Sequence, residues 1–342
     1  MKTIKIGMVG FGNVGHGFLQ TLAEKKDYFR REYSLQFLVT AITDIRYGTI
    51  YDPQGLPADQ LAVSSDFSGL SPDFFRDWNT IQMIRNADTD VIIELSFTDL
   101  KTGEPAVLHC QEALLSGKHV ITSNKGPIAL HYKHLKELAR DNGVKIGCEG
   151  TVMSGSPALR LGVDSLLPTG ITEIQGILNG TTNYILSRME NGATYEEALL
   201  QAQELGYAEA DPSGDVEGFD TAGKVAILAQ FIFNTFIKPE DVEREGITNI
   251  TPEDIKEAAQ KNMRWKLIGS LKKTEHGVEA SVKPVMLPMD NPLANITGAG
   301  NAIQYHSDLL GSITLFGPGA GRKITKCFLY RNSKPNPGMD PL

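Results

Sequence analysis

Cysteine is scarce in this chain of 342 residues. Only Cys110, Cys148 and Cys327 are present, an odd number with no CxxC pair among them. Domains held together by disulfides carry paired cysteines at a much higher density. A disulfide framework is therefore not expected.

Basic residues are outnumbered, and long apolar runs are missing. Lys and Arg together number 33 against 41 Asp and Glu, which gives a formal charge of −8. Nucleic acid is not expected as the main partner, because phosphate binding needs concentrated Lys and Arg. No apolar stretch reaches the roughly 18 residues of a membrane-spanning helix, and residues 1–6 lead into a strand pattern without a secretory signal. We expect a cytoplasmic protein without a membrane partner.

The first half begins with a pattern typical of dinucleotide binding. A strand pattern over residues 4–9 leads directly into Gly10-Phe-Gly12-Asn13-Val14-Gly15, and a helical pattern follows. In this context Gly10 permits a tight turn, Gly12 lets the backbone approach a pyrophosphate, and Gly15 allows close packing of helix on strand. The helix N-terminus would face the phosphates. Because a strand precedes the glycines and a helix follows, the pattern favours a cofactor site over a glycine turn without a ligand.

A second strand pattern, residues 36–43, ends before Asp44 and Arg46. An acidic residue there can accept a hydrogen bond from the adenosine ribose of NAD, whereas an Arg nearby can pair with the 2′-phosphate of NADP. An ordinary charged loop would explain both residues equally well. Because of Arg46 we predict NADP as the cofactor, with NAD as the alternative.

Further strand patterns at residues 91–95 and 119–122 alternate with helical patterns at 105–116 and 131–141. This alternation predicts an α/β fold with a Rossmann-type, doubly wound parallel sheet. Ligands of such sheets bind beyond the carboxyl ends of the strands, so Ser96 and the Ser123-Asn124-Lys125 turn are expected beside the nicotinamide. A solvated surface lysine remains the alternative for Lys125.

Two turns in the second half could bind charged groups. Residues 149–157 are small apart from Glu149 and would expose carbonyl oxygens suited to a hard cation, although a compact interdomain linker explains them more simply. Residues 176–184 include Gly180 and Thr181 and offer donors for a carboxylate or a developing oxyanion. A helix cap by Thr181 or Thr182 is the alternative for that turn.

Residues 205–224 are the most informative segment. Five carboxylates precede one amine in a turn shaped by glycine and proline: Glu209, Asp211, Asp215, Glu217 and Asp220, then Lys224. Such a loop can hold a zwitterionic small molecule and exchange a proton with it. Asp220 and Lys224 could instead form an ion pair four residues apart on a helix. A calcium loop fits poorly, because Pro212 and Ser213 break the EF-hand pattern.

Together these segments resemble homoserine dehydrogenase, the NAD(P)-dependent enzyme that interconverts L-aspartate 4-semialdehyde and L-homoserine in threonine, methionine and isoleucine biosynthesis. The resemblance covers residues 4 to about 321 and follows the order of the family's motifs. It rests on residues 10–15, 123–125, 149–157, 176–184, 205–224 and 291–303, and on the closing glycines at 317–321.

By that resemblance, Lys224 is the proton donor, while Asp220 and Glu209 hold the substrate and position the lysine. Asp215 and Thr181, with Gly180, would line the same pocket. Lys125 would lie between substrate and cofactor. Asp211 and Glu217 are left as solvated turn residues.

The resemblance also implies further ligands and an assembly. A structural monovalent cation such as Na⁺ would bind Glu149 and the carbonyls of Val152, Ser154 and Ser156, and Gly321 would return to the cofactor. We expect an NAD(P)-binding domain over residues 1–148 and a second, α+β domain over 149–300 for catalysis and dimerisation. A segment from about 300 to 342 would return to the first domain. The expected assembly is a homodimer.

Two other functions stay open. A different two-domain NAD(P) oxidoreductase acting on an amino acid, such as an aspartate dehydrogenase, would share the first half but has no reason for Glu209, Asp220 and Lys224 at this spacing. A non-catalytic dinucleotide sensor would tolerate loss of the lysines, yet both Lys125 and Lys224 are present.

Overall fold

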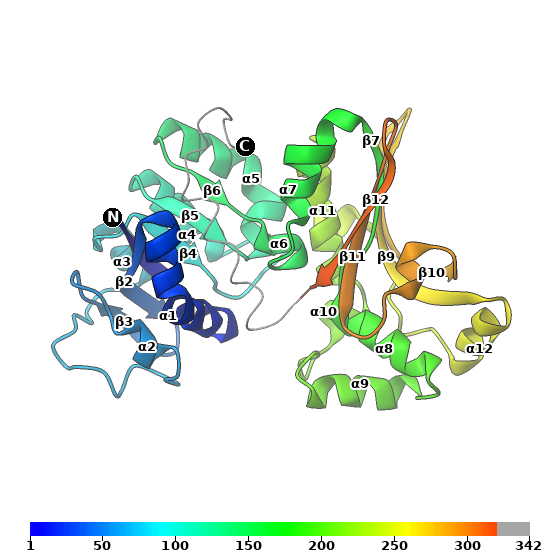
Figure 1. The fold of residues 1–342 in the computed structure, drawn as a ribbon, viewed down its shortest axis with the longest axis horizontal. Coiled ribbons are helices and arrows are strands. Elements are labelled where there is room, and N and C mark those ends of the chain that lie inside the picture. Colours follow the sequence, from blue (N-terminus) through cyan, green and yellow to red (C-terminus); the bar gives the residue numbers. More distant parts are fainter. Residues whose placement is uncertain (320–342) are drawn as a thin grey trace. The chain divides into compact units, whose positions relative to one another are not determined.

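The computed structural model describes residues 1–319, and the chain divides into two compact units (Figure 1). The first unit contains Met1–Thr151, and the second begins at Val152 and includes the rest of the described residues. The boundary lies close to the predicted position 148. Cys327 and Gly321 lie outside the described residues.

The first unit is built on a six-stranded sheet in the order β3-β2-β1-β4-β5-β6. Five of these strands are parallel, as predicted, whereas the edge strand β3 runs antiparallel to β2. The bounds are β1 Lys2–Val9, β2 Leu35–Asp44, β3 Gly48–Tyr51, β4 Val91–Glu94, β5 His119–Thr122 and β6 Ile146–Gly147. The strand order reverses between β1 and β4, which is where ligands of doubly wound sheets bind.

Helices cover both faces of this sheet. They are α1 Asn13–Tyr33, α2 Ala58–Leu61, α3 Thr80–Asn86, α4 Ala106–Leu115 and α5 Lys125–Asp141. One apolar cluster gathers Ile6 and Met8 with α1, and another gathers Val9 and Ile92 with α3 and α4. Because successive strand residues point to opposite faces, the two clusters fill the two layers of the predicted fold.

Helix α5 begins at Lys125, six residues before the predicted start at 131. Asn124 is the reason, since its side-chain oxygen accepts a hydrogen bond from the Gly126 backbone N–H at 3.1 Å and caps the helix. Pro127 lies in the first turn, where its missing N–H costs no hydrogen bond. Lys125 is therefore the first residue of a helix and does not belong to a turn.

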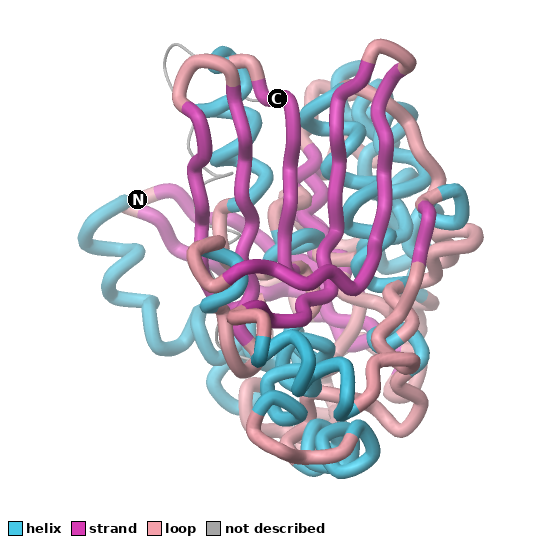
Figure 2. Tube along the Cα trace, turned by 90° about the vertical axis from the view of Figure 1, so that its right-hand side faces the viewer, coloured by secondary structure: helices cyan, strands magenta, loops and turns pink. Residues whose placement is uncertain are grey.

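The second unit contains a mostly antiparallel sheet in the order β12-β11-β7-β9-β10-β8, whose long strands are seen in Figure 2. The bounds are β7 Ile171–Ile177, β8 Glu243–Arg244, β9 Met263–Thr274, β10 Gly277–Pro288, β11 Gly300–Ser307 and β12 Gly311–Pro318. Strands β11 and β12 pair with each other, and β11 also pairs with β7. The return to the first domain that we expected from about residue 300 therefore does not begin there, because this stretch completes the second sheet.

The helices of the second unit are α6 Gly150–Met153, which spans the boundary, α7 Ala158–Arg160, α8 Gly180–Glu190, α9 Tyr195–Glu204, α10 Ser213–Val216, α11 Phe219–Phe233 and α12 Pro252–Gln260. Helix α11 packs closely on β9 at Gly269. A Cβ atom on Gly269 would lie 2.9 Å from a methyl carbon of Thr221 and 2.9 Å from one of Val225. This close approach fixes the part of α11 that carries Lys224.

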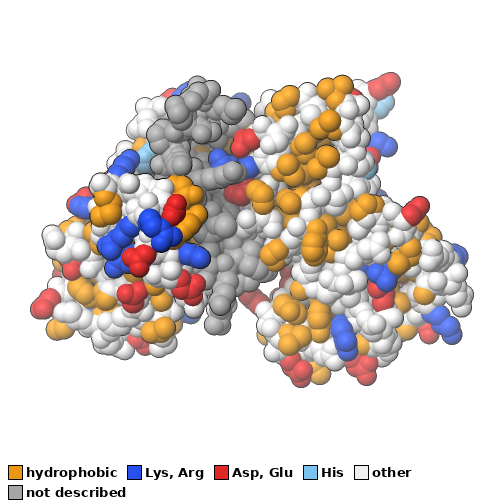
Figure 3. Space-filling model, viewed as in Figure 1, with side chains coloured by type: hydrophobic (Ala, Val, Ile, Leu, Met, Phe, Trp, Pro, Cys, Tyr) orange, Lys and Arg blue, Asp and Glu red, His pale blue; other side chains and the backbone are white. Residues whose placement is uncertain are grey.

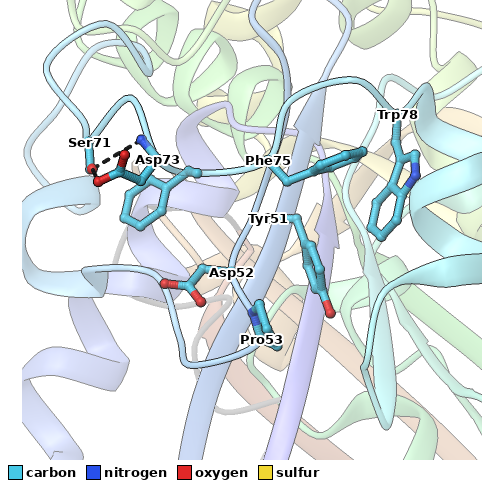
Figure 4. Close-up of a pocket in the computed structure, with 8 residues that line it drawn as sticks. Tyr51, Asp52, Pro53, Ser71, Asp73, Phe75 and Trp78 are labelled. Atoms are coloured by element: carbon cyan, nitrogen blue, oxygen red, sulfur yellow. Dashed lines mark hydrogen bonds between the residues drawn. The ribbon is translucent and has the colours of Figure 1, made fainter.

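A cavity of about 500 Å³ opens on the first unit beside the edge strand β3 (Figure 4). Tyr51, Phe75 and Trp78 line it, with the Trp78 ring centre 4.9 Å from that of Tyr51 and 4.6 Å from that of Phe75. Tyr51 pairs with Ala41, three residues before the carboxyl end of β2. The cavity thus lies away from the sheet edge that carries the glycine turn.

Within the described part of the chain, no helix combines the length and the apolar character needed to cross a membrane.

Candidate active site

The glycine turn after β1 leaves open space above its backbone. Gly10 has a φ of +103°, and a Cβ atom there would lie 2.6 Å from the Leu95 carbonyl oxygen, so the fold itself requires this glycine. Gly12 is exposed, and a Cβ atom on it would meet nothing within 4 Å. It is the N-cap of α1, has no side-chain capping hydrogen bond and is followed by no acidic residue in the first turn. Uncapped N–H groups under open space fit a pyrophosphate.

Asp44 and Arg46 are bonded to each other beside this turn. One carboxylate oxygen of Asp44 accepts from the Phe11 backbone N–H at 2.8 Å, and the other accepts from the Arg46 backbone N–H at 2.9 Å and from its Nε at 3.0 Å. Burial opposes ionisation of Asp44, but the hydrogen bonds from Arg46 and Phe11 outweigh it and hold the pKa of Asp44 below its usual value. The Arg46 guanidinium therefore forms an ion pair with the Asp44 carboxylate.

The predicted grouping of residues after β4 and β5 is present. The Asn124 side-chain N–H donates to the Ser96 carbonyl at 3.1 Å and to the Phe97 carbonyl at 2.8 Å. Ser123, which precedes Asn124, and Lys125 are half-buried at the same edge of the sheet. The first unit thus gathers the predicted cofactor residues around the carboxyl ends of β1, β4 and β5.

The second unit gathers a lysine and two carboxylates around one amide. Lys224 is buried in α11, and its Nζ donates to an Asp220 carboxylate oxygen at 2.5 Å and to the Leu178 carbonyl at 2.6 Å. The side-chain N–H groups of Asn179 donate to Asp215 at 2.6 Å and to Asp220 at 3.0 Å. The ion pair on one helical face is therefore present, and it forms part of a larger polar cluster.

Asn179 was missed by the sequence analysis. Its side-chain oxygen accepts from the Thr182 backbone N–H at 2.9 Å, so Asn179 caps α8, and Thr181 and Thr182, the alternative caps considered from the sequence, lie within its first turn. The available signal was an Asn directly before Gly180, because Asn is among the best N-cap residues. The same side chain thus both starts a helix and joins two carboxylates.

The pKa of Asp215 is raised, first by burial and then by the negative charge of Asp220. The hydrogen bond from Asn179 and the positive charge of Lys224 oppose this shift. A half-buried carboxylate of this kind gains when it meets a cation. The ammonium of an amino acid is such a group.

The other predicted substrate residues lie in different surroundings. Thr181 is buried, and its hydroxyl donates to the Tyr207 carbonyl at 2.7 Å, which ties α8 to the acidic loop. Gly180 is the first residue of α8. Glu209 is exposed, and its backbone carbonyl accepts from the Gln203 side chain.

Residues 149–156 form a compact turn that includes α6. Val152, Ser154 and Ser156 are buried, and Ser154, with a φ of +52°, has the left-handed conformation directly after the end of α6 at Met153. The Ser156 carbonyl accepts from the Ala158 N–H at 2.8 Å. No cluster of three or more His, Cys, Asp or Glu side chains suited to a metal occurs among the described residues. The turn offers one carboxylate and several carbonyls, a set of donors that suits a weakly bound hard cation.

Comparisons with known proteins place the chain in a family. The family model described as "Homoserine dehydrogenase, NAD binding domain" matches residues 10–149, and the model "Homoserine dehydrogenase" matches residues 157–327. The chain belongs to the homoserine dehydrogenase family. It is 43% identical over 329 residues to the NAD(+)-dependent homoserine dehydrogenase of Pseudomonas canavaninivorans, covering 95% of this chain and 94% of that protein.

Solved homoserine dehydrogenase structures are similar over nearly the whole chain. A structure of the putative enzyme from Archaeoglobus fulgidus is 40% identical with a TM-score of 0.83, covering 95% of this chain and 96% of that one. A mutant hyperthermophilic archaeal enzyme in complex with NADPH is 30% identical with a TM-score of 0.82, covering 97% and 96%. The protein is an NAD(P)-dependent oxidoreductase that acts on a CH–OH group and interconverts L-aspartate 4-semialdehyde and L-homoserine, a step of threonine, methionine and isoleucine biosynthesis. The alternatives of an aspartate dehydrogenase and a non-catalytic sensor are not favoured.

Replacing the half-buried Asp215 carboxylate should separate stability from substrate binding. Because the pKa of Asp215 is raised, its ionised form costs stability above that pKa. Asp215→Asn should therefore raise the urea midpoint at pH 7, and the gain should vanish as the pH falls through the raised pKa to the ordinary range of Asp. The KM for homoserine should rise about ten-fold through loss of a charged contact.

Asp211→Asn is the matched control on the same loop. The hydrogen bond from the Ser213 backbone lowers the pKa of this exposed carboxyl, so its replacement should bring no gain in stability and no change in KM. A wild type that is more stable than Asp215→Asn at pH 7 would contradict the interpretation.

Proposed function

We propose that Lys224 gives a proton to the aldehyde oxygen of aspartate semialdehyde and takes it back when homoserine is oxidised. The observation that carries this proposal is the fixed position of its Nζ, held by the Asp220 carboxylate and the Leu178 carbonyl in a buried setting. In the direction of reduction the oxygen gains negative charge. A positioned ammonium stabilises that charge and delivers the proton.

The other residues of the cluster bind and orient. Asp220 holds the lysine, and Asn179 holds Asp220 and Asp215 at a defined separation by bonding to both. Asp215 meets the substrate ammonium, because a cation offsets the burial that raises the pKa of this carboxyl. Glu209 is exposed and would gain less from the same contact. Backbone N–H groups at Gly180 and Thr181 receive the substrate carboxylate.

In the first unit, residues 10–15, Ser96, Ser123 and Lys125 are proposed to hold the dinucleotide. The exposed Gly12 and the uncapped start of α1 support this placement for the pyrophosphate. When bound, the dinucleotide supplies or accepts the hydride. The chain's own contribution there is to bind and orient it, with Lys125 at the nicotinamide end.

Removal of the amine tests the proposed proton donor. Lys224→Met should lower kcat by about 10²–10⁴-fold, as expected for loss of a general acid. The Kd for the reduced cofactor should stay within about two-fold of the wild-type value, because the lysine is not part of the proposed dinucleotide site. Lys238→Met, which removes an exposed lysine of the same unit, is the control. Undiminished turnover by Lys224→Met, measured as reduction of the semialdehyde, would assign the proton transfer to another group.

We further propose that NAD is the preferred cofactor, which reverses our sequence-based preference for NADP. The Asp44 carboxylate lies beside the glycine turn, and the Arg46 guanidinium is already paired with it through Nε. A 2′-phosphate would meet the carboxylate with like charge, a repulsion of several kcal/mol when not relieved. The NAD(+)-dependent name of the relative from Pseudomonas canavaninivorans agrees with this choice.

Two variants test the choice of cofactor. Asp44→Ser should raise kcat/KM for NADP relative to NAD by about ten-fold or more, because it removes the repulsion and releases Arg46. Arg46→Ala should leave the use of NAD nearly unchanged. A wild type that prefers NADP, together with an Arg46→Ala variant that loses that preference, would instead support our sequence-based prediction.

A bound cation and a dimer are proposed as well. Glu149 and the carbonyls of Val152, Ser154 and Ser156 are proposed to hold Na⁺, so replacing Na⁺ by choline should lower the melting temperature.

The homodimer is proposed to form through the face of the second sheet opposite Gly269. There Phe316 is 63% and Val285 37% exposed, and hydrophobic groups are visible on this unit in Figure 3. Sedimentation equilibrium showing a monomer at micromolar concentration would exclude this dimer.

A further inference from the structure

A buried carboxylate stands at the end of β4, where neither the fold nor the proposed chemistry has used it. Glu94 is the last residue of the strand and is 0% exposed. Burial of a carboxylate is unfavourable unless hydrogen bonds compensate, and an apolar residue of similar size is often at least as stable in such a position. The presence of Glu94 therefore calls for a role beyond filling the core.

The partners of Glu94 belong to the sheet edge where the dinucleotide is proposed to bind. One carboxylate oxygen accepts from both the backbone N–H, at 3.1 Å, and the hydroxyl of Ser96. The His109 Nδ1 lies 3.4 Å from the same oxygen. The Thr122 hydroxyl donates to the Glu94 backbone carbonyl at 3.1 Å and lies 3.4 Å from the other carboxylate oxygen. The strongest contacts of the carboxylate thus hold the first turn after β4.

The network closes through Asn124. The Thr122 hydroxyl oxygen accepts from the Asn124 backbone N–H at 2.9 Å, and the Asn124 side chain donates to the carbonyls of Ser96 and Phe97. Glu94 and Thr122 are also direct neighbours in the pairing of β4 with β5. The Asn124 side chain thereby joins the start of α5, where Lys125 lies, to the Ser96 turn that the Glu94 carboxylate holds.

We propose that Glu94 is a positioning residue for the nicotinamide end of the cofactor. Its carboxylate fixes the Ser96 turn directly, and the carbonyls of that turn accept from the Asn124 side chain at the start of α5, so that the groups meeting the nicotinamide are held before it binds. Preorganisation of this kind strengthens binding because fewer groups must be ordered on association. The inference rests on the proposed dinucleotide site of the first unit and adds a residue that does not touch the cofactor.

The test compares two ligands that differ in the nicotinamide. NADH contains it, whereas ADP-ribose lacks the nicotinamide ring and keeps the adenosine, the pyrophosphate and the second ribose. Glu94→Gln keeps the size of the side chain but leaves one acceptor oxygen for Ser96 and Thr122. In the full-length enzyme it should weaken NADH binding about ten-fold, the loss typical of a charged hydrogen bond, with ADP-ribose affinity changed less than about two-fold. An equal loss for both ligands, or no loss for either, would overturn the proposal.

Three further variants separate position from charge and from folding. Glu94→Asp keeps the charge but is too short to reach Ser96, so it should lose NADH affinity as Glu94→Gln does; full retention would overturn the proposal. Ser96→Ala removes the donor from a half-buried residue and should show the same selective loss even if the Glu94 variants fold poorly. In the double variant, Ser96→Ala should reduce NADH affinity little beyond the loss caused by Glu94→Gln, because the effects of two bonded partners are not additive.

Glu112→Gln is the matched control. It removes another carboxylate of the first unit, one bonded to Arg85 through two hydrogen bonds of 2.6 and 2.8 Å away from this edge. The ratio of NADH to ADP-ribose affinity should stay at the wild-type value. If the wild type binds neither ligand, the proposed dinucleotide site itself is wrong. If the wild type binds both ligands and the Glu94 variants bind them equally well, the dinucleotide site stands and only the role of Glu94 is wrong.

Discussion

The contact between the Asn179 amide and two carboxylates organises the polar cluster around Lys224. Asp215 and Asp220 carry like charges that would repel each other, and burial makes that repulsion stronger than in water. A shared amide donor and the Lys224 ammonium hold them together. Because Asn179 also caps α8, the separation of the two carboxylates is tied to the start of that helix, where Gly180 and Thr181 lie.

The first unit uses the same physical device at the edge of its sheet. A buried acceptor, Glu94, joins turns that follow neighbouring strands, and Asn124 both caps α5 and bonds to the turn after β4. In each unit an asparagine at a helix N-cap also donates its side-chain N–H groups to a neighbouring segment: Asn124 to the turn after β4, and Asn179 to carboxylates of α10 and α11. Such networks specify loop conformation because every alternative would leave buried polar groups without partners.

Much of the first unit could be predicted from sequence because its signals are local. Strands ending at Val9, Glu94 and Thr122 read as apolar runs, and the glycines after β1 had an unambiguous strand–helix context. Local signals were less informative where a side-chain hydrogen bond, and not the helix or strand propensity of the residues, sets the limits of an element. The start of α5 was placed too late because the capping role of Asn124 was not recognised. The strands β11 and β12 were assigned to the wrong unit because strand pairing is a non-local contact.

The sequence by itself determined the family, the two-domain organisation and the identity of the acidic loop with its lysine, because these depend on the order and spacing of residues along the chain. Only the tertiary structure decided which carboxylates share a donor, that Arg46 is engaged with Asp44, and that Glu94 and Thr122 meet across neighbouring strands. Glu209 and Asp215 are equivalent in a linear acidic loop, but burial separates them. The reason is physical: desolvation and hydrogen-bond geometry depend on distances through space, which the chain order does not contain.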